Sequence, residues 1–263
     1  MGAFDLFNVV ITKTGFLELY WGHIVMWLIG FFFLYLAIKH DFEPLLLVPI
    51  GFSIFLVNLP LAPLTGPGEL INLFFKWGLE TEIIPCLIFL GVGALTDFGP
   101  MIANPKTLLL GASAQLGVYI AFFGSIFFNF NLQEAGCIGI IGGADGPTSI
   151  YLASALAPHM LGMVAVAAYS YMAMVPLIQP PIMKLFTTEK ERKIRMKQLR
   201  PVSRTERLIF PIVATIVICL LTPPAAPLIG LLMLGNLFRE CKVVDRLLKT
   251  SQNELLNIVT IIL

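Results

Sequence analysis

The sequence predicts an all-α polytopic membrane protein: a helical bundle with a broken or re-entrant helix at residues 135–157, forming the first part of an inverted-repeat transporter fold. Of its 263 residues, 57% are hydrophobic and only 13% are charged, and the mean hydropathy is +0.88. The apolar residues form runs of about 17 to 25, the length of helix that crosses roughly 30 Å of hydrocarbon. In one run, glycines and a proline surround a single aspartate, as in the discontinuous helices of transporters.

We expect residues 1–263 to form a single transmembrane domain with about eight apolar segments. In chain order, these segments are 22–38, 44–61, 83–102, 107–128, 135–157, 160–183, 208–222 and 224–238. The last two are short for membrane-spanning helices. A further apolar run begins at Asn253 and reaches Leu263, which is too short to span a membrane. This pattern predicts a C-terminally incomplete chain whose second repeat is largely missing after residue 263.

Positive charge is concentrated in the loop 184–207, between two apolar segments. The loop holds nine of the 17 Lys and Arg residues, namely Lys184, Lys190, Arg192, Lys193, Arg195, Lys197, Arg200, Arg204 and Arg207. The positive-inside rule places it on the cytoplasmic side, where it can also form a docking surface for a soluble partner. A second basic cluster, Arg239, Lys242, Arg246 and Lys249, follows segment 224–238 after an even number of crossings, so the same side is expected for it.

Segment 135–157 is open to two topologies. Pro147 interrupts its helix, because proline lacks an N–H and clashes with the carbonyl four residues earlier. The segment either crosses the membrane, which places the N-terminus of the chain in the cytoplasm, or re-enters on the side from which it came. In the second case the number of crossings places the N-terminus outside.

The interruption contains an ionisable residue, Asp145, in the sequence GGADGPT. A carboxylate at the bilayer centre costs roughly 2.5–3.5 kcal/mol, so it requires a cation, a proton or fixed dipoles nearby. Pro147 frees the carbonyl of Gly143, and Gly146 is biased away from helical geometry because it precedes proline. The pattern therefore predicts a sodium-sized oxygen site, for which the candidate ligands are Asp145, Gly143, Thr148 and Ser149.

Each of these residues also has a purely structural interpretation. Asp145 can serve as the N-cap of a helix that begins near Pro147. Thr148 and Ser149 can return their hydroxyl groups to the preceding turn of their own helix. The glycines Gly142, Gly143 and Gly146 can allow helices to pack closely, although three of them around one carboxylate favour an open backbone.

Two tyrosines lie halfway along segment 160–183, at mid-membrane depth. Tyr169 and Tyr171 are two residues apart, so on a helix their side chains point about 200° from one another. We therefore expect only one of them to face Asp145. The structural alternative is that both belong to an aromatic belt at the membrane surface.

Several function classes lack their sequence signatures. The chain has no Walker motif, no G-x-G-x-x-G fingerprint, no zinc-ligand spacing and no Ser-His-Asp constellation. It also has no basic patch interleaved with aromatic residues for nucleic acid. The energy for transport is therefore expected from an ion gradient or from a chemical step on a partner.

Four stretches of the chain resemble the β subunit of the sodium-pumping, biotin-dependent decarboxylases that act on oxaloacetate, methylmalonyl-CoA or glutaconyl-CoA. They are GGADGPTSIYLASALAP (142–158), LTDFGPMIANPK (95–106), AYSYMAMVPLIQPPIMK (168–184) and LRPVS (199–203). The resemblance runs along nearly the whole chain. Members of that family continue, after the counterpart of Leu263, into a second half with its own broken helix.

The resemblance implies that different subunits carry out successive steps. A soluble carboxyltransferase α subunit moves a carboxyl group to biotin on a carrier protein or domain, and the β subunit decarboxylates the carboxybiotin, exports Na+ and takes up a proton. The implied cofactors are Na+ and the partner's biotin; a small membrane γ or δ subunit, other β subunits and membrane lipid are further partners. The implied location is the cell (inner) membrane of a bacterium or archaeon. By residue, Asp145 would bind Na+ or a proton and Tyr171 would deliver the proton, with Tyr169 beside it.

Two other functions fit the same residues. A secondary cation/proton antiporter or a sodium-coupled organic-anion symporter would use a broken helix without any chemical step. A membrane scaffold without transport would leave Asp145 unexplained. A biotinylated protein that co-purifies with the chain would favour the decarboxylase.

Overall fold

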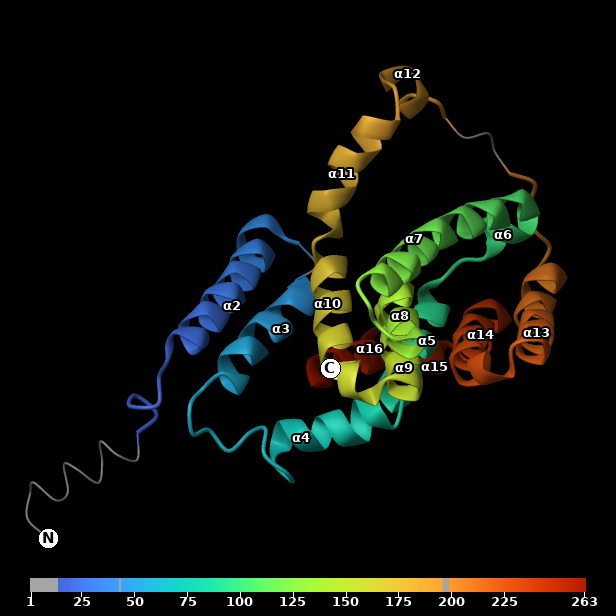
Figure 1. Ribbon diagram of the computed structural model, residues 1–263. Coiled ribbons are helices and arrows are strands. Elements are labelled where there is room, and N and C mark those ends of the chain that lie inside the picture. Colours follow the sequence, from blue (N-terminus) through green and yellow to red (C-terminus); the bar gives the residue numbers. More distant parts are fainter. Residues whose placement is uncertain (1–13, 43, 196–198) are drawn as a thin grey trace, which may run out of the picture. The chain divides into compact units, whose positions relative to one another are not determined.

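The structure is a computed structural model that describes residues 14–42, 44–195 and 199–263. Throughout these residues the regular structure is helical and contains no strand, so the predicted all-α class is confirmed (Figure 1). The chain divides into two compact units, residues 1–77 and 78–263, which are described separately. The expectation of a single transmembrane domain stays a prediction.

The first unit is built on two apolar helices, α2 (Trp21–His40) and α3 (Pro44–Val57). Glycines allow them to approach closely: a Cβ atom on Gly30 would lie 2.9 Å from the carbonyl oxygen of Gly51. With 20 residues, α2 is about 30 Å long, which matches the hydrocarbon thickness. The helix α3 is shorter and contains Pro49.

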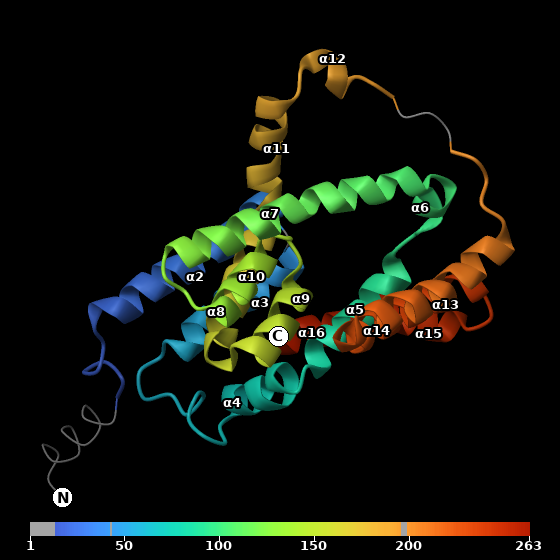
Figure 2. The same cartoon turned by 45° about the vertical axis from the view of Figure 1, so that its right-hand side comes forward.

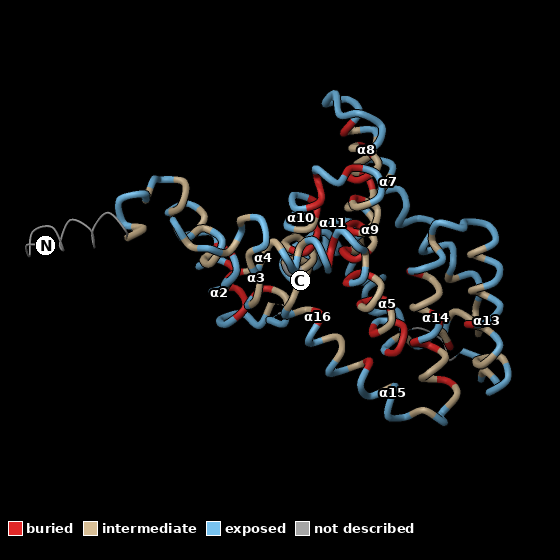
Figure 3. Tube along the Cα trace, turned by 90° about the horizontal axis from the view of Figure 1, so that it is seen from below, coloured by how far each residue is buried: buried red, intermediate tan, exposed pale blue. Residues whose placement is uncertain are grey.

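The second unit contains the predicted broken segment. Four helices follow one another there: α7 (Leu108–Phe127), α8 (Leu132–Ile141), α9 (Gly146–Leu156) and α10 (Leu161–Ala173). Each of them packs against the helix that follows it, and α8 also contacts α10, so the four lie side by side in both views (Figures 1 and 2). Figure 3 shows that buried residues gather in α9 and in α5 (Ile83–Leu95), which also contact each other.

The helices α8 and α9 form an antiparallel hairpin. The Cys137 sulfur contacts the carbonyl oxygen of Leu152 at 3.9 Å, and at the open end Glu134 pairs with His159 at 3.0 Å. The N–H of Asn131, followed by the His159 ring, lowers the pKa of Glu134 below its usual value. Because the chain reverses at residues 142–145, the structure favours the re-entrant topology for segment 135–157 over a crossing.

A second compact pair consists of α5 and α14 (Ala226–Cys241), which run antiparallel. A Cβ atom on Gly93 would lie 1.8 Å from the carbonyl oxygen of Leu232, and one on Gly235 would lie 2.0 Å from that of Leu90. Neither distance is compatible with any side chain, so both glycines are required for the contact. The helix α13 (Arg204–Leu221) packs on the other side of α14.

Gly235→Ala should lower the thermal unfolding temperature of the purified protein in detergent, because overpacking a helix contact of this kind costs about 1–3 kcal/mol. Gly230 provides the matched control on the same helix, since a Cβ atom there would meet nothing within 4 Å. Gly230→Ala should raise the unfolding temperature, because alanine is favoured over glycine in a helix by about 1 kcal/mol. Equal effects of the two substitutions would contradict the close α5–α14 contact.

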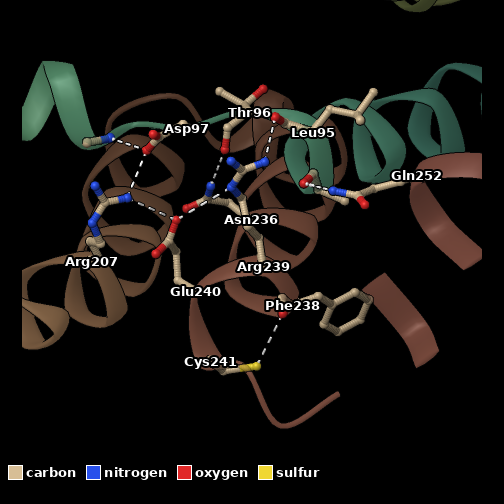
Figure 4. A network of polar contacts seen from close by, with 12 residues as sticks. Leu95, Thr96, Asp97, Arg207, Asn236, Phe238, Arg239, Glu240, Cys241 and Gln252 are labelled. Carbon is tan, nitrogen blue, oxygen red and sulfur yellow. Dashed lines mark hydrogen bonds and ion pairs between the residues drawn. The ribbon is translucent and has the colours of Figure 1, made fainter. Parts of the chain in front are cut away.

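Polar side chains hold the C-terminal end of α5 (Figure 4). The last carbonyl groups accept hydrogen bonds from α14 and from the segment after it: Ala94 from Gln252 at 2.6 Å, Leu95 from Arg239 at 2.9 Å and Thr96 from Asn236 at 2.8 Å. These bonds satisfy carbonyls that a helix end otherwise leaves without a donor. The chain therefore stops being helical at Thr96, and the expected segment 83–102 is divided between α5 and α6 (Gly99–Ala103).

An ion cluster lies at the same end. Arg207, at the start of α13, contacts Asp97 at 2.9 Å and Glu240 at 3.5 Å, while Arg239 lies 3.8 Å from Glu240. Glu240 is buried. The cluster joins the ends of α5, α13 and α14 on the side that carries both basic regions of the sequence.

By length and composition, two of the described helices can cross a membrane, or up to four if each bent pair counts as one span. They are α2, the helix at 105–127, and the bent pairs 70–80 with 83–95 and 158–172 with 175–186. Other apolar helices, such as α3 and α8, are shorter than a span.

The remaining elements are α4 (Leu70–Phe74), η1 (Phe75–Glu80), η2 (Pro105–Thr107), η3 (Pro158–Met160), α11 (Val175–Phe186), α12 (Glu189–Arg192), η4 (Pro223–Ala225), α15 (Asp245–Thr250), η5 (Ser251–Leu255) and α16 (Leu256–Ile262).

Candidate functional site

The hairpin tip is a tight turn between α8 and α9. Its amide groups fold back onto the end of α8: the N–H of Gly142 donates to Gly139, that of Gly143 to Ile140 and that of Ala144 to Ile141. Ala144 has φ 60°, a left-handed conformation that is rare for a residue with a side chain. Such strain persists only where the surrounding structure holds it, and it is common at functional sites.

Asp145 is the N-cap of α9. One carboxylate oxygen accepts from the N–H of Thr148 at 3.3 Å, and the other accepts from the Thr148 hydroxyl at 2.5 Å. The structural interpretation of Asp145 is thus confirmed. It does not exclude an ionic role, because the carboxylate lies at the positive end of a helix dipole and is half-buried.

The other predicted oxygen ligands take up different positions. The Ser149 hydroxyl is fully buried and donates to the carbonyl of Asp145 at 2.7 Å, which is the back-bonding alternative. The Thr148 hydroxyl is the one that reaches the carboxylate. Gly143 precedes Pro147 by four residues, so its carbonyl receives no helical N–H from that position. Thr148 and Gly143 therefore remain the neighbours of Asp145 that can offer oxygen to a cation.

The glycines of the tip also serve close packing. A Cβ atom on Gly142 would lie 2.5 Å from the carbonyl oxygen of Gly117 on α7, and one on Gly143 would lie 3.2 Å from the side chain of Val118. A Cβ atom on Gly146 would lie 3.1 Å from the Tyr169 ring. Gly142 and Gly143 therefore form part of the turn, and all three glycines also permit close contacts that larger residues would prevent.

Both tyrosines of α10 reach the tip, one on each flank. The Tyr171 hydroxyl donates to the carbonyl of Ile141 at 2.8 Å, at the end of α8. Tyr169 is buried against Gly146 at the start of α9, and its hydroxyl is buried without a hydrogen-bond partner among the described residues. Both tyrosines thus contact the turn that carries Asp145, although neither hydroxyl is bonded to its carboxylate among the described residues. Which of the two serves Asp145 stays a prediction.

The tip lies well away from the open end of the hairpin. Tyr171 is ten residues into α10, and at 1.5 Å per residue this places it about 15 Å from the open end of the hairpin. That distance is half of the roughly 30 Å hydrocarbon layer. The arrangement can hold a cation or a proton on Asp145 away from bulk water, with two phenol groups beside it.

Some residues of the site were not recognised in the sequence. Met172 accepts the N–H of Gly146 through its sulfur at 3.2 Å, and Ala144 adopts the left-handed conformation that glycine usually takes. No local signal marks either residue. Glu82 is a further unrecognised carboxylate; it accepts from the Ser154 hydroxyl of α9 at 3.1 Å. Its position directly before the apolar run 83–95 could have marked it.

Comparison with known proteins identifies the family. The family model of the Na+-transporting oxaloacetate decarboxylase beta subunit matches residues 22–263. The methylmalonyl-CoA decarboxylase subunit beta of Veillonella parvula is 61% identical over 97% of this chain and 67% of its own length. The glutaconyl-CoA decarboxylase subunit beta of Acidaminococcus fermentans is 60% identical over 97% and 68%. The oxaloacetate decarboxylase beta chain of Klebsiella pneumoniae is 45% identical over 97% and 73%.

These matches decide between the functions that the sequence left open, in favour of the decarboxylase over a secondary carrier. The apolar helices agree with a membrane subunit. The chain therefore belongs to the family of Na+-transporting oxaloacetate decarboxylase β subunits, membrane proteins with a role in decarboxylation-coupled Na+ transport.

Proposed function

We propose that the hairpin tip is the coupling site, at which Asp145 alternately holds Na+ and a proton. The observation that supports this most directly is the half-buried carboxylate of Asp145 at the tip of the α8–α9 hairpin. Thr148 and the carbonyl of Gly143 would complete the oxygen ligands of Na+, and Ser149 would contribute through the backbone carbonyl that it orders. Tyr171 would deliver the proton from the α8 side of the tip.

The chemical step would supply the energy. Decarboxylation of carboxybiotin consumes one proton and yields biotin and CO2. Moving one Na+ outward works against about 2.3 kcal/mol per 100 mV of membrane potential, so an exergonic step must accompany each cycle. A proton taken up from the outer side would replace Na+ on Asp145, and the same proton would then be available for the decarboxylation.

The partners follow from the same proposal. A carboxyltransferase α subunit and a biotin carrier protein or domain would bring carboxybiotin from the cytoplasm, and a small γ or δ subunit and further β subunits would assemble with this chain in the membrane. The acid that is decarboxylated would be selected by the α subunit.

The basic loop 184–207 is the proposed docking surface. Between α11 and α13 its described part contains the short helix α12, which begins with a capping box in which the N–H of Thr188 donates to Glu191 at 2.7 Å. This bond lowers the pKa of Glu191 below its usual value. Lys193 pairs at 2.5 Å with Glu189, four residues earlier, in the i,i+4 order that stabilises helices. Lys197 lies outside the described residues.

We also propose a multi-pass orientation in the inner membrane with the loop 184–207 in the cytoplasm. The ion cluster of Figure 4 and the second basic region lie at the same end of α5, α13 and α14. The open end of the hairpin lies at the opposite end, because Ser154 near it donates to Glu82, which directly precedes the first residue of α5. The hairpin would therefore enter from the outer side, which places the N-terminus of the chain outside.

The proposal can be tested with the assembled complex in vesicles whose orientation is checked by protease cleavage in the loop 184–207. In vesicles with this loop facing the bath, substrate decarboxylation should drive Na+ into the lumen and make the lumen more alkaline, because the proton that replaces Na+ comes from that side. Potassium in place of sodium should support neither change. Na+ uptake without luminal alkalinisation would contradict proton uptake from the outer side.

A further inference from the structure

Glu82 lies at the start of α5, in a backbone conformation that is unfavourable for glutamate. Its φ is 63°, which is left-handed and rare for a residue with a side chain. It makes no side-chain capping bond to α5. Its carboxylate instead accepts a hydrogen bond from Ser154, which belongs to the arm α9 of the hairpin. The strained backbone thus directs an acidic group toward the hairpin and away from the N–H groups of its own helix.

This carboxylate has no cationic partner among the described residues, in which every recorded ion pair involves other acids. The titratable groups that face it are the thiol of Cys86, one turn along α5, and the phenol of Tyr151 on α9. Glu82 is half-buried and directly precedes the apolar run of α5. A carboxylate without a cationic partner at the end of an apolar segment is a functional candidate in a membrane protein.

Oxygen-bearing side chains lie along α9 between the tip and Glu82. Asp145, Thr148, Tyr151 and Ser154 recur every third residue, so successive members are neighbours on a line that winds half a turn around the helix. The Tyr151 hydroxyl on this line donates to the carbonyl of Pro224. The first pair is joined by the 2.5 Å bond between carboxylate and hydroxyl, and the last member donates to Glu82. From Asp145 to Ser154 the helix rises about 13 Å, from the tip toward the open end of the hairpin.

We propose that Glu82 is the outer proton-loading group of the pump, the carboxylate that first accepts the proton destined for Asp145. The inference rests on the proposed function of Asp145 and extends it to the outward half of the path. A proton from water on the outer side forms an O–H bond on Glu82. It then passes along this line of side chains, through their hydroxyl groups and through water between them, and ends on Asp145 as Na+ leaves. Only O–H bonds form and break.

The test uses the complex in vesicles with the loop 184–207 facing the bath, so that the lumen corresponds to the outer side. Glu82→Gln keeps an oxygen that accepts from Ser154 but cannot take up a proton. Turnover should fall about tenfold or more at luminal pH 8, where protons are scarce, and recover most of this loss at luminal pH 6. Protection of the complex by Na+ against heat should stay unchanged, because Asp145 is intact.

Two further variants distinguish a proton-loading role of Glu82 from a structural one. Glu80 is an exposed carboxylate two residues earlier in the chain, and Glu80→Gln should retain the luminal pH profile of the unaltered complex. Ser154→Ala removes the hydrogen bond but keeps the carboxylate, so it should lower turnover less than Glu82→Gln at luminal pH 8. An equal loss of turnover at both pH values in Glu82→Gln and Ser154→Ala would overturn the proposal. It would show that Glu82 only stabilises the position of α9 through its hydrogen bond. The pump proposal itself would fail differently, by an absence of luminal alkalinisation in the unaltered complex.

Discussion

Asp145→Asn should reduce sodium-dependent decarboxylation of carboxybiotin by at least about 100-fold in the assembled complex, the scale on which a group that accepts and donates protons contributes to catalysis. Asparagine has nearly the same size and is as good an N-cap as aspartate. Its side-chain oxygen can still accept from the N–H of Thr148, the bond that begins α9. What the substitution removes is the charge that must alternate between Na+ and a proton.

The control for this experiment is assembly. The variant complex should purify with the same subunits and unfold within a few degrees of the unaltered one, while Na+ no longer raises its unfolding temperature. A ligand that binds only the folded state stabilises it by about 2.7 kcal/mol at 100 times its dissociation constant, so the loss of this effect is measurable. Sodium-stimulated turnover near the normal rate in Asp145→Asn would rule out Asp145 as the coupling group.

The two tyrosines of α10 should give opposite stability effects when each is replaced by phenylalanine. Tyr171→Phe removes the hydroxyl that donates to Ile141, so stability should fall by about 1 kcal/mol, and turnover should fall about 100-fold if this hydroxyl passes the proton. Tyr169→Phe removes a buried hydroxyl that has no partner among the described residues. Its unfolding temperature should rise, and its turnover should change little.

Sodium protection separates the two roles that a hydroxyl at this site can have. Na+ should still protect the Tyr171→Phe complex against heat, because a proton donor is not a sodium ligand. If protection and turnover are lost together in Tyr171→Phe, that hydroxyl binds Na+. If Tyr169→Phe loses turnover as severely, the hydroxyl at the α9 flank carries the proton instead.

The sequence was sufficient to predict the broken helix, because the cause is local. Pro147 and its neighbouring glycines end one helix and begin another whatever surrounds them, and Asp145 is an exception in an apolar segment. The direction of the chain after the break was not predictable. It depends on contacts such as those between Glu134 and His159, which lie 25 residues apart.

The tyrosines show where helical geometry alone is insufficient. The 200° separation of Tyr169 and Tyr171 is correct, but the inference treated Asp145 as a point, whereas the tip is a turn with two flanks. The contact between α5 and α14 was also beyond the sequence. Gly93 and Gly235 are ordinary glycines in apolar helices until the fold brings each against a backbone carbonyl.

Because Asp145 is both the candidate ion-binding group and the first residue of α9, ion occupancy and the start of a helix are thermodynamically linked. A carboxylate is a stronger hydrogen-bond acceptor than the protonated acid, so the first turn of α9 is held less firmly once a proton replaces Na+. An N-cap contributes about 0.5–2 kcal/mol, enough to change the population of the intact turn several-fold. Ala144, already in a left-handed conformation, lies immediately before this turn and provides the pivot. If Asp145 exchanges Na+ for a proton as proposed, the exchange of one monovalent ion for another would wind and unwind a single helical turn at the tip of the hairpin.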